Sequence, residues 1–311
     1  MSVTVFSPAK INLFLAITDR RMDGFHNLVS VVAPLDFGDE LKATKVARGT
    51  GSPFRLECDA AGIPLDDSNL ILKAAKAFTF ATGWPDPTGG EAVYFELKKR
   101  IPMGAGLGGG SSNAVAALRA MNTLSGNTVS MEKLTTIAIA LGSDCALFLH
   151  DAPVTMRARG DQIEVLPEIA ARRLRGRKVL LFKPGFGIST PWAYGRMAAE
   201  APAHYLPAPQ AEQRISQWMN GNDSVSSLLF NNMEAVAFRK FVALPVLLEK
   251  LQAELGVEAR MSGSGSACFA VIGEGAVTGN PVGEIEGVTQ MKHLIRECWG
   301  DAVFIQEAAL L

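Results

Sequence analysis

Apolar and polar side chains alternate along the start of the chain with the period of a β-strand. The alternation covers residues 3–7, stops at Pro8, and resumes over residues 11–17. A polar stretch over residues 19–24 has the composition of a turn, and the apolar run over residues 28–35 fits a buried strand. The pattern therefore predicts two strands separated at Pro8, then a turn and a third strand.

Further along, apolar residues recur at helical intervals in some segments and alternate in others. Polar residues at Ser68, Asn69 and Ser130 mark two helix starts. Helical spacing covers residues 70–78, 114–124, 131–141 and 246–255, and strand spacing covers residues 93–97 and 179–182. This irregular mixture favours an α+β fold over a regular βαβ array.

The chain has 311 residues, a length that favours two domains at roughly 100–200 residues each. With 48% apolar and 20% charged residues, a wholly disordered chain is excluded. Five basic residues within residues 172–178 mark a change in composition, and we place the boundary before them, giving domains at 1–161 and 162–311. The basic run has no interleaved aromatic residues, so we interpret it as a solvated turn and not a nucleic-acid surface.

The formal net charge is −1, from 30 Lys+Arg and 31 Asp+Glu. Such a chain has no global field that draws it to nucleic acid or an anionic membrane, so an anionic ligand must be held locally. The sequence has no segment resembling a membrane span or a signal peptide. The four cysteines, Cys58, Cys145, Cys268 and Cys298, form no C-x-x-C pair. We expect a reduced, soluble, cytoplasmic protein.

A glycine-rich stretch over residues 102–112 carries the most specific chemistry. It has five glycines within seven residues, then Ser111 and Ser112, then a helical pattern. Glycines let main-chain N–H groups approach a ligand closely, and the first N–H groups of a helix are unpaired and carry a partial positive charge. The combination predicts a phosphate-binding loop.

Three other interpretations of this stretch compete. Residues 104–109 match G-x-G-x-x-G, but the dinucleotide fingerprint needs an acidic residue about 20 positions on, and none occurs before Glu132. A P-loop is excluded because no lysine follows the glycines. A flexible surface loop is the remaining alternative.

The pattern Pro-x-Gly-x-Gly-Leu-Gly-Gly-Gly-Ser-Ser resembles the ATP-binding loop of the GHMP kinases. The family's two other motifs occur in the right order, as Pro-Ala-Lys-Ile-Asn-Leu at residues 8–13 and Met-Ser-Gly-Ser-Gly-Ser-Ala at residues 261–267. The resemblance implies an α+β fold with an N-terminal ATP-binding domain and a C-terminal ferredoxin-like substrate domain. It also implies ATP and Mg²⁺ as cofactors.

Blocks at residues 21–28, 141–149 and 183–190 are most similar to the GHMP kinases that act on methylerythritol linked to cytidine diphosphate. The resemblance implies transfer of the γ-phosphoryl group of ATP to the 2-hydroxyl of that substrate, in the non-mevalonate route to isoprenoids. The chain has Phe25 where this subfamily has Tyr, Asn113 where it has Asp, and Cys-Ala-Leu-Phe after Asp144 in place of Val-Pro-Phe-Phe. Phe25 keeps a face for stacking without the hydroxyl, and Asn113 removes a negative charge near the phosphates.

Two catalytic residues, Lys10 and Asp144, follow from the resemblance. Asp144 would accept the hydroxyl proton, and Lys10 would pair with it and neutralise charge near that hydroxyl. Taken alone, Asp144 is a helix cap and Lys10 a solvated strand lysine. The residues by themselves leave both interpretations open.

The substrate-binding residues implied are Asn12, Phe25, His26 and Tyr194. Asn12 lies two residues after Lys10, hence on the same face of a strand, where it would bind methylerythritol or cap the strand end. Phe25 and Tyr194 would stack on the two faces of cytosine, and His26 would bond to it. Each of these aromatic residues, taken alone, is more often core packing.

The ATP-binding residues implied are the loop and two further positions assigned by family position. Ser111 and Ser112 would bind phosphate or Mg²⁺, or would simply cap the helix. No metal ligand is assigned. The full set is Pro102, Met103, Gly104, Ala105, Gly106, Leu107, Gly108, Gly109, Gly110, Ser111, Ser112, Lys98 and Asn69.

Alternative functions separate on simple features. A GHMP kinase acting on homoserine or a mevalonate-type acid would have no base to stack on Phe25. A binding module without catalysis would not need Lys10 and Asp144. A nicotinamide oxidoreductase would need the ribose-binding acid that is absent here.

Overall fold

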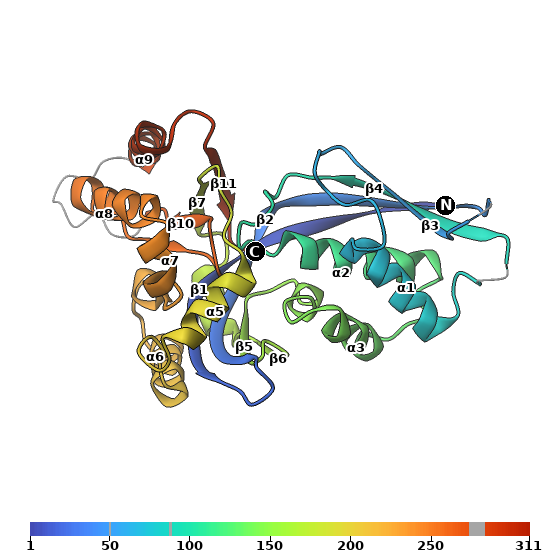
Figure 1. Cartoon of the computed structure of the whole chain (residues 1–311), viewed down its shortest axis with the longest axis horizontal. Helices are drawn as coiled ribbons and strands as arrows, with labels where there is room; N and C mark the ends of the chain where they lie inside the picture. The colour runs from blue at the N-terminus through green and yellow to red at the C-terminus, as the bar shows by residue number, and fades with distance from the viewer. Residues whose placement is uncertain (50, 87–88, 274–283) are drawn as a thin grey trace. The chain divides into compact units, whose positions relative to one another are not determined.

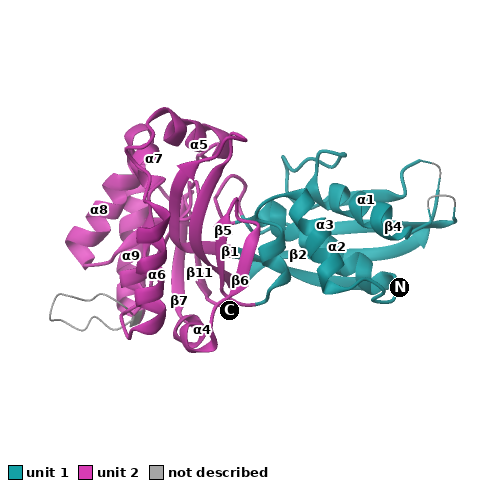
Figure 2. Ribbon diagram, turned by 90° about the horizontal axis from the view of Figure 1, so that it is seen from below, with its two compact units in different colours: residues 1–9, 37–101, 108–151 teal, residues 10–36, 102–107, 152–311 magenta. Residues whose placement is uncertain are grey.

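The computed structural model describes residues 1–49, 51–86, 89–273 and 284–311. The chain forms two compact units, each built from several segments: unit 1 is residues 1–9, 37–101 and 108–151, and unit 2 is residues 10–36, 102–107 and 152–311 (Figure 2). The long strands β1 (Ser2–Arg20) and β2 (His26–Ala47) contribute residues to both units. The proposed domain boundary between residues 161 and 162 stays a prediction.

Unit 1 is a layer of helices on strands. Its strand β4 pairs antiparallel with residues 40–47 of β2 and parallel with β3. Figure 2 shows α1, α2 and α3 gathered on one side of these strands, where Phe78 and Phe95 are fully buried. The elements besides β1 and β2 are β3 (Phe54–Cys58), α1 (Leu70–Thr82), β4 (Glu91–Lys98), α2 (Gly109–Leu124), α3 (Met131–Leu141) and η1 (Ala146–Leu149).

Unit 2 contains a four-stranded antiparallel sheet in the order β11-β7-β10-β9. Numbered along the chain, this order is 4-1-3-2, with helices after the first and third strands, as in a ferredoxin-like fold. The α+β prediction with this C-terminal topology is confirmed. Figure 2 shows α8 and α9 on one side of the sheet.

The other strands of unit 2 pair outside this four-stranded sheet. Residues 28–32 of β2 pair with β5, and Phe14 and Leu15 of β1 pair in parallel with β8. The elements are β5 (Val154–Ala158), β6 (Gln162–Val165), α4 (Glu168–Leu174), β7 (Lys178–Lys183), α5 (Thr190–Ala199), α6 (Ala208–Asn220), η2 (Ser226–Leu228), β8 (Phe230–Asn231), α7 (Glu234–Lys240), α8 (Ala243–Leu255), β9 (Ala259–Met261), β10 (Cys268–Val271), α9 (Glu284–Trp299) and β11 (Phe304–Ala309) (Figure 1).

Pro8 does not interrupt the first strand, so that prediction is wrong. The strand β1 continues through it because the neighbouring part of β2 carries a glycine: a Cβ added at Gly38 would lie 2.3 Å from the Ser7 carbonyl oxygen and 2.8 Å from Pro8 Cα. The two strands can therefore approach at the position where Pro8 lacks an N–H group.

The helix starts predicted at Asn69 and Ser130 are confirmed. The Asn69 side chain accepts from Ile71 N at 2.9 Å, and the Ser130 hydroxyl accepts from Lys133 N at 3.3 Å. Within the described ranges, no helix has the length and apolar character that a bilayer crossing requires.

Candidate active site

The first half of the glycine loop is bonded to the C-terminal glycine motif within unit 2. Ser266 N donates to Gly104 O at 3.3 Å, and the Ser262 hydroxyl donates to Gly106 O at 3.0 Å. Gly106 has a φ of +74°, and a Cβ there would lie 2.1 Å from the Ser262 carbonyl oxygen. Only glycine allows this approach, so two motifs far apart in sequence form one backbone surface.

Lys10 and Asn12 lie on that surface. Lys10 N donates to Leu107 O at 3.0 Å, and Lys10 Nζ donates to Asn12 Oδ1 at 2.6 Å, which confirms that the two residues share a face of β1. Asn12 Nδ2 in turn donates to the Ser30 hydroxyl at 3.0 Å. Lys10 is only 3% exposed, so it is not the solvated strand lysine of the alternative interpretation. A cation buried beside two glycine motifs is an arrangement suited to an anionic ligand.

His26, the first residue of β2, is buried in an aromatic cluster of unit 2. Its Nε2 atom lies 3.1 Å from the Tyr205 hydroxyl, and its ring centroid lies 5.1 Å from that of Tyr194 and 5.9 Å from that of Tyr205. Burial, together with the charge of Arg20, lowers the pKa of His26, so the neutral ring is favoured near pH 7. The neutral ring has one donor and one acceptor nitrogen, which suits hydrogen bonding to a polar ring such as a base.

Tyr205 was missed by sequence reasoning. It lies between α5 and α6, and no local pattern in the sequence links it to His26. The neighbouring Phe25 is 54% exposed, so the core-packing interpretation is wrong for this residue. The Arg159 guanidinium lies 5.1 Å from the Phe25 ring centroid, which leaves a cation–π pair at the surface of unit 2.

In unit 1, helix α2 begins inside the glycine run. Gly108 is its N-cap, with φ +73° and no side-chain cap, so the interpretation of Ser111 and Ser112 as caps is wrong. The buried Ser112 hydroxyl accepts from the Ser7 hydroxyl at 2.8 Å. The first N–H groups of a 16-residue helix are thus left without a side-chain cap, and the helix dipole adds positive potential there.

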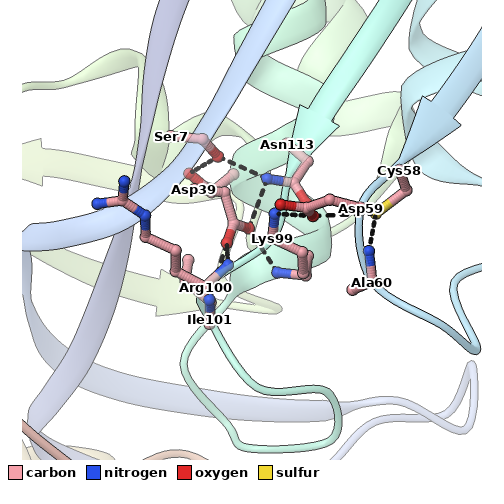
Figure 3. Close-up of polar contacts among 10 residues, drawn as sticks. Ser7, Asp39, Cys58, Asp59, Ala60, Lys99, Arg100, Ile101 and Asn113 are labelled. Atoms are coloured by element: carbon pink, nitrogen blue, oxygen red, sulfur yellow. Dashed lines mark hydrogen bonds and ion pairs between the residues drawn. The ribbon is translucent and has the colours of Figure 1, made fainter.

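A buried polar cluster fixes the chain on both sides of the loop (Figure 3). The Asp39 carboxylate accepts from Lys99 Nζ, from Arg100 N at 2.7 Å and from Ile101 N at 2.8 Å, all from the segment that enters the loop. From α2, Asn113 Nδ2 donates to Asp39 Oδ2 at 2.8 Å. Asn113 therefore supplies a donor to a buried carboxylate, a role that an aspartate could not fill in its ionised form.

The lysine beside the glycine loop is Lys99. A Cβ added at Gly109 would lie 3.0 Å from Lys99 Nζ. Lys98, the residue selected from the sequence, is exposed at the end of β4 and pairs with Glu40 at 2.8 Å. Lys98 is the last residue of β4 and Lys99 follows the strand. The pairing with Asp39 that distinguishes Lys99 is not visible in the sequence.

The two remaining predicted residues lie near the start of α2. Asn69 caps α1, and a Cβ added at Gly110 would lie 3.6 Å from Cδ1 of the next residue, Leu70. Asp144 lies in a turn just before η1 and not in a helix. Burial raises the pKa of the next residue, Cys145, to about 11; the Ser111 hydroxyl opposes this shift by hydrogen bonding, and the Asp144 charge adds to it. Asp144 therefore belongs to the same part of unit 1 as the first turn of α2.

Comparison with known proteins finds matches to two models of one protein family. The model of the GHMP kinases N terminal domain matches residues 69–152, and that of GHMP kinases C terminal matches residues 212–278. A 4-diphosphocytidyl-2-C-methyl-D-erythritol kinase from Synechococcus elongatus is 33% identical over 308 residues, which cover 95% of this chain and 92% of the relative. The chain belongs to the GHMP kinase family. It is an ATP-dependent small-molecule kinase.

Further relatives of this GHMP kinase agree. The 4-diphosphocytidyl-2-C-methyl-D-erythritol kinase of Chlorobium phaeobacteroides is 38% identical over 273 residues, covering 88% of this chain and 90% of the relative. A crystal structure of 4-(cytidine 5'-diphospho)-2C-methyl-D-erythritol kinase matches with a TM-score of 0.73 and 30% identity over 99% of both chains. A homoserine kinase from Cytophaga hutchinsonii, at a TM-score of 0.71 and 17% identity over 99% of this chain and 95% of that one, shares the fold.

Proposed function

We propose that this GHMP kinase transfers the γ-phosphoryl group of ATP to the 2-hydroxyl of 4-diphosphocytidyl-2-C-methyl-D-erythritol, in the non-mevalonate route to isoprenoid precursors. The observation that carries the proposal is the content of unit 2: Lys10 and Asn12 buried beside two glycine motifs, and His26 in a cluster with Tyr194 and Tyr205. The first group suits phosphate and hydroxyl chemistry, and the second suits a nucleobase. Homoserine and mevalonate-type acids have no base for the second group to bind.

The ATP phosphates would be held by main-chain N–H groups. Residues Gly108–Ser112 present the first turn of α2, where unpaired donors and the helix dipole favour an anion. Residues Pro102–Leu107 provide the neighbouring backbone, fixed by the C-terminal glycine motif. We propose Asn69, at the start of α1, as a side chain that contacts the nucleotide. Lys99 would contribute positive charge beside the loop while bonded to Asp39, and Lys98, which is exposed and paired with Glu40, stays the family-based proposal.

The acceptor hydroxyl would be oriented by Asn12 and activated by Lys10 and Asp144. Phosphoryl transfer needs mainly positioning and charge stabilisation, with a carboxylate to accept the hydroxyl proton. Asp144 is our candidate for that base, and the Lys10 ammonium would stabilise charge as the alkoxide forms. The pairing of these two residues rests on the family resemblance.

The cytosine would be bound by stacking and by the neutral His26. Phe25 offers an exposed ring and Tyr194 a second one, and offset stacking is worth about 1 kcal/mol beyond burial. The Tyr205 hydroxyl fixes the His26 ring through Nε2, which leaves the ring's other nitrogen for the base.

We propose that Mg²⁺ accompanies the nucleotide. Among the described residues, no three His, Cys, Asp or Glu side chains are grouped so as to hold a metal ion. Mg²⁺ is commonly bound through the substrate phosphates and a small number of protein oxygens, so the Ser111 hydroxyl is the group that would hold it beside the phosphates. When bound, the ion would neutralise charge on the transferring phosphates.

We also propose a cytoplasmic location, with a small-molecule substrate and without a nucleic-acid partner. All four cysteines fall in described segments and are free thiols, which is usual in reducing compartments.

A coupled ADP-release assay tests the function. With Mg-ATP, the wild-type chain should turn over the cytidine-bearing substrate and neither homoserine nor mevalonate. Asp144→Asn should lower kcat about 10²–10⁴-fold with nearly unchanged ATP affinity. The exposed Asp151, which pairs with Arg119 in the same unit, provides the control Asp151→Asn, with wild-type activity expected.

Three results would each contradict one part of the proposal. A folded wild-type chain without turnover of this substrate would remove the proposed function. Full activity in Asp144→Asn would remove this residue from the mechanism. Phe25→Ala should raise KM for the cytidine-bearing substrate and leave KM for ATP unchanged. An unchanged KM for the cytidine-bearing substrate would contradict the stacking role.

A further inference from the structure

The C-terminal glycine motif approaches the proposed catalytic lysine closely. A Cβ added at Gly263 would lie 3.4 Å from both Lys10 Nζ and Asn12 Oδ1, and Asn12 N donates to the Ser262 hydroxyl at 3.4 Å. The main chain at residues 262–263 therefore forms one wall around the ammonium group of Lys10. Any shift of this segment changes where the ammonium can lie.

One asparagine side chain bonds to the main chain on both sides of Ser262. Asn231, at the end of β8, is 4% exposed, and its Nδ2 atom donates to Met261 O at 2.7 Å and to Gly263 O at 2.8 Å. Its Oδ1 atom accepts from Met233 N at 3.0 Å. Both amide protons are used on carbonyls two residues apart, so the side chain sets the curvature of the segment between them.

A second side chain completes the attachment. The Glu234 carboxylate, at the start of α7, accepts from Met261 N at 2.8 Å. Met261 thus has both its N–H and its C=O bonded to side chains, one from the start of α7 and one from the end of β8. The strand β8 is itself registered on β1 only a few residues from Lys10, through Phe14 with Phe230 and Leu15 with Asn231.

We propose that Asn231, with Glu234, is a positioning residue for phosphoryl transfer: it fixes residues 261–263 and through them the place of the Lys10 ammonium. The inference rests on the proposed function, because it gives Lys10 a role in catalysis. It adds a pair of residues that act through their bonds to the main chain. A displacement of about 1 Å at a reacting group can cost about 10²-fold in rate, so the effect is measurable.

The test uses the isosteric variant Asn231→Asp, which keeps the shape and removes both donors. The matched control is Asn122→Asp in unit 1, because Asn122 also bonds one loop by donating to Val129 O at 3.1 Å and accepting from Val129 N at 3.0 Å. We expect both variants to lose stability, and Asn231→Asp alone to lower kcat about 10- to 100-fold with KM for the cytidine-bearing substrate within about threefold. Hydrogen exchange of the peptide covering residues 261–267 should speed up only in Asn231→Asp.

A second pair of variants keeps the inference testable if Asn231→Asp does not fold. Glu234→Gln retains an acceptor for Met261 N and should keep wild-type kcat, whereas Glu234→Leu removes it and should lower kcat several-fold. Wild-type kcat in folded Asn231→Asp, or equal kcat in the two Glu234 variants, would overturn the inference. An inactive wild-type chain would instead overturn the proposed function, and the inference with it.

Discussion

Asp39 in unit 1 and Glu234 in unit 2 are carboxylates that hold the main chain just before a glycine motif, but their surroundings differ. Asp39 is completely buried and accepts from a lysine, an asparagine amide and two main-chain N–H groups (Figure 3). Glu234 accepts from Met261 N, and its charged neighbours are Arg260 and the like-charged Glu258. Burial raises the pKa of Glu234 to about 7.

The two sites show that the donors and charges around a carboxylate determine its role in the fold. An ionised group that has a cation and several donors around it behaves as a fixed part of the scaffold, because removing it strands its partners. Burial makes the Glu234 carboxyl keep its proton to a higher pH than usual, and the bond from Met261 N opposes this shift. Asp39 therefore supports the fold around the loop, whereas Glu234 leaves unit 2 sensitive to pH.

The largest effect should come from breaking the first site with Asp39→Ala. The variant leaves the Lys99 ammonium and the Asn113 amide buried without their acceptor, so we expect the free energy of unfolding to fall by about 3–5 kcal/mol. Urea denaturation followed by circular dichroism measures it. Lys42→Ala, which breaks an exposed ion pair with Glu96 between β2 and β4, should cost less than about 1 kcal/mol. Equal losses in the two variants would contradict the scaffold role of Asp39.

A smaller loss of stability is expected when either of two glycines of the loop is replaced by alanine, and the two losses should differ. Gly106→Ala combines a left-handed φ with a Cβ 2.1 Å from the Ser262 carbonyl oxygen, whereas Gly104→Ala has a similar φ of +59° and its nearest atom, Gly187 Cα, at 3.7 Å. Each should lose about 1–2 kcal/mol from backbone strain. Gly106→Ala should lose about 1–3 kcal/mol more from overpacking, with a larger fall in kcat/KM for ATP. Thermal unfolding and the ADP-release assay compare them, and identical behaviour would show that the contact relaxes freely.

Local signals in the sequence predicted much of this kinase. The period of two put Lys10 and Asn12 on one face of a strand, and the polar starts at Asn69 and Ser130 are helix caps in the structure. The glycine run predicted a loop that opens a helix, and α2 begins inside it. These features depend on neighbours a few residues apart, which a single sequence displays.

Long-range partners could not be predicted in the same way. Asp39 meets Lys99 and Asn113 across 60 and 74 residues, and Tyr205 meets His26 across 179. Arg173, interpreted as part of a solvated turn, donates to Trp218 O and lies 4.2 Å from that residue's ring centroid. No spacing rule identifies such pairs, because the fold brings them together only after the local elements have formed.

The last predicted effect concerns Glu234 and appears only when the pH is changed. Its ordinary pKa is 4.5 and the folded value is about 7, so its contribution to stability is fully present below pH 4.5 and is lost as pH rises through 7. Glu234→Gln cannot titrate and keeps an acceptor for Met261 N. Relative to this variant, the wild-type chain should therefore lose stability as pH rises from 4.5 through 7, by about 3–4 kcal/mol in total at about 1.4 kcal/mol per pKa unit. Denaturation of both chains across this pH range measures the difference in their free energies of unfolding.

The outcome that would contradict this prediction is a difference that stays constant with pH. It would show that Met261 N and Arg260 fully offset the cost of burying the Glu234 charge, and the contrast with Asp39 would disappear.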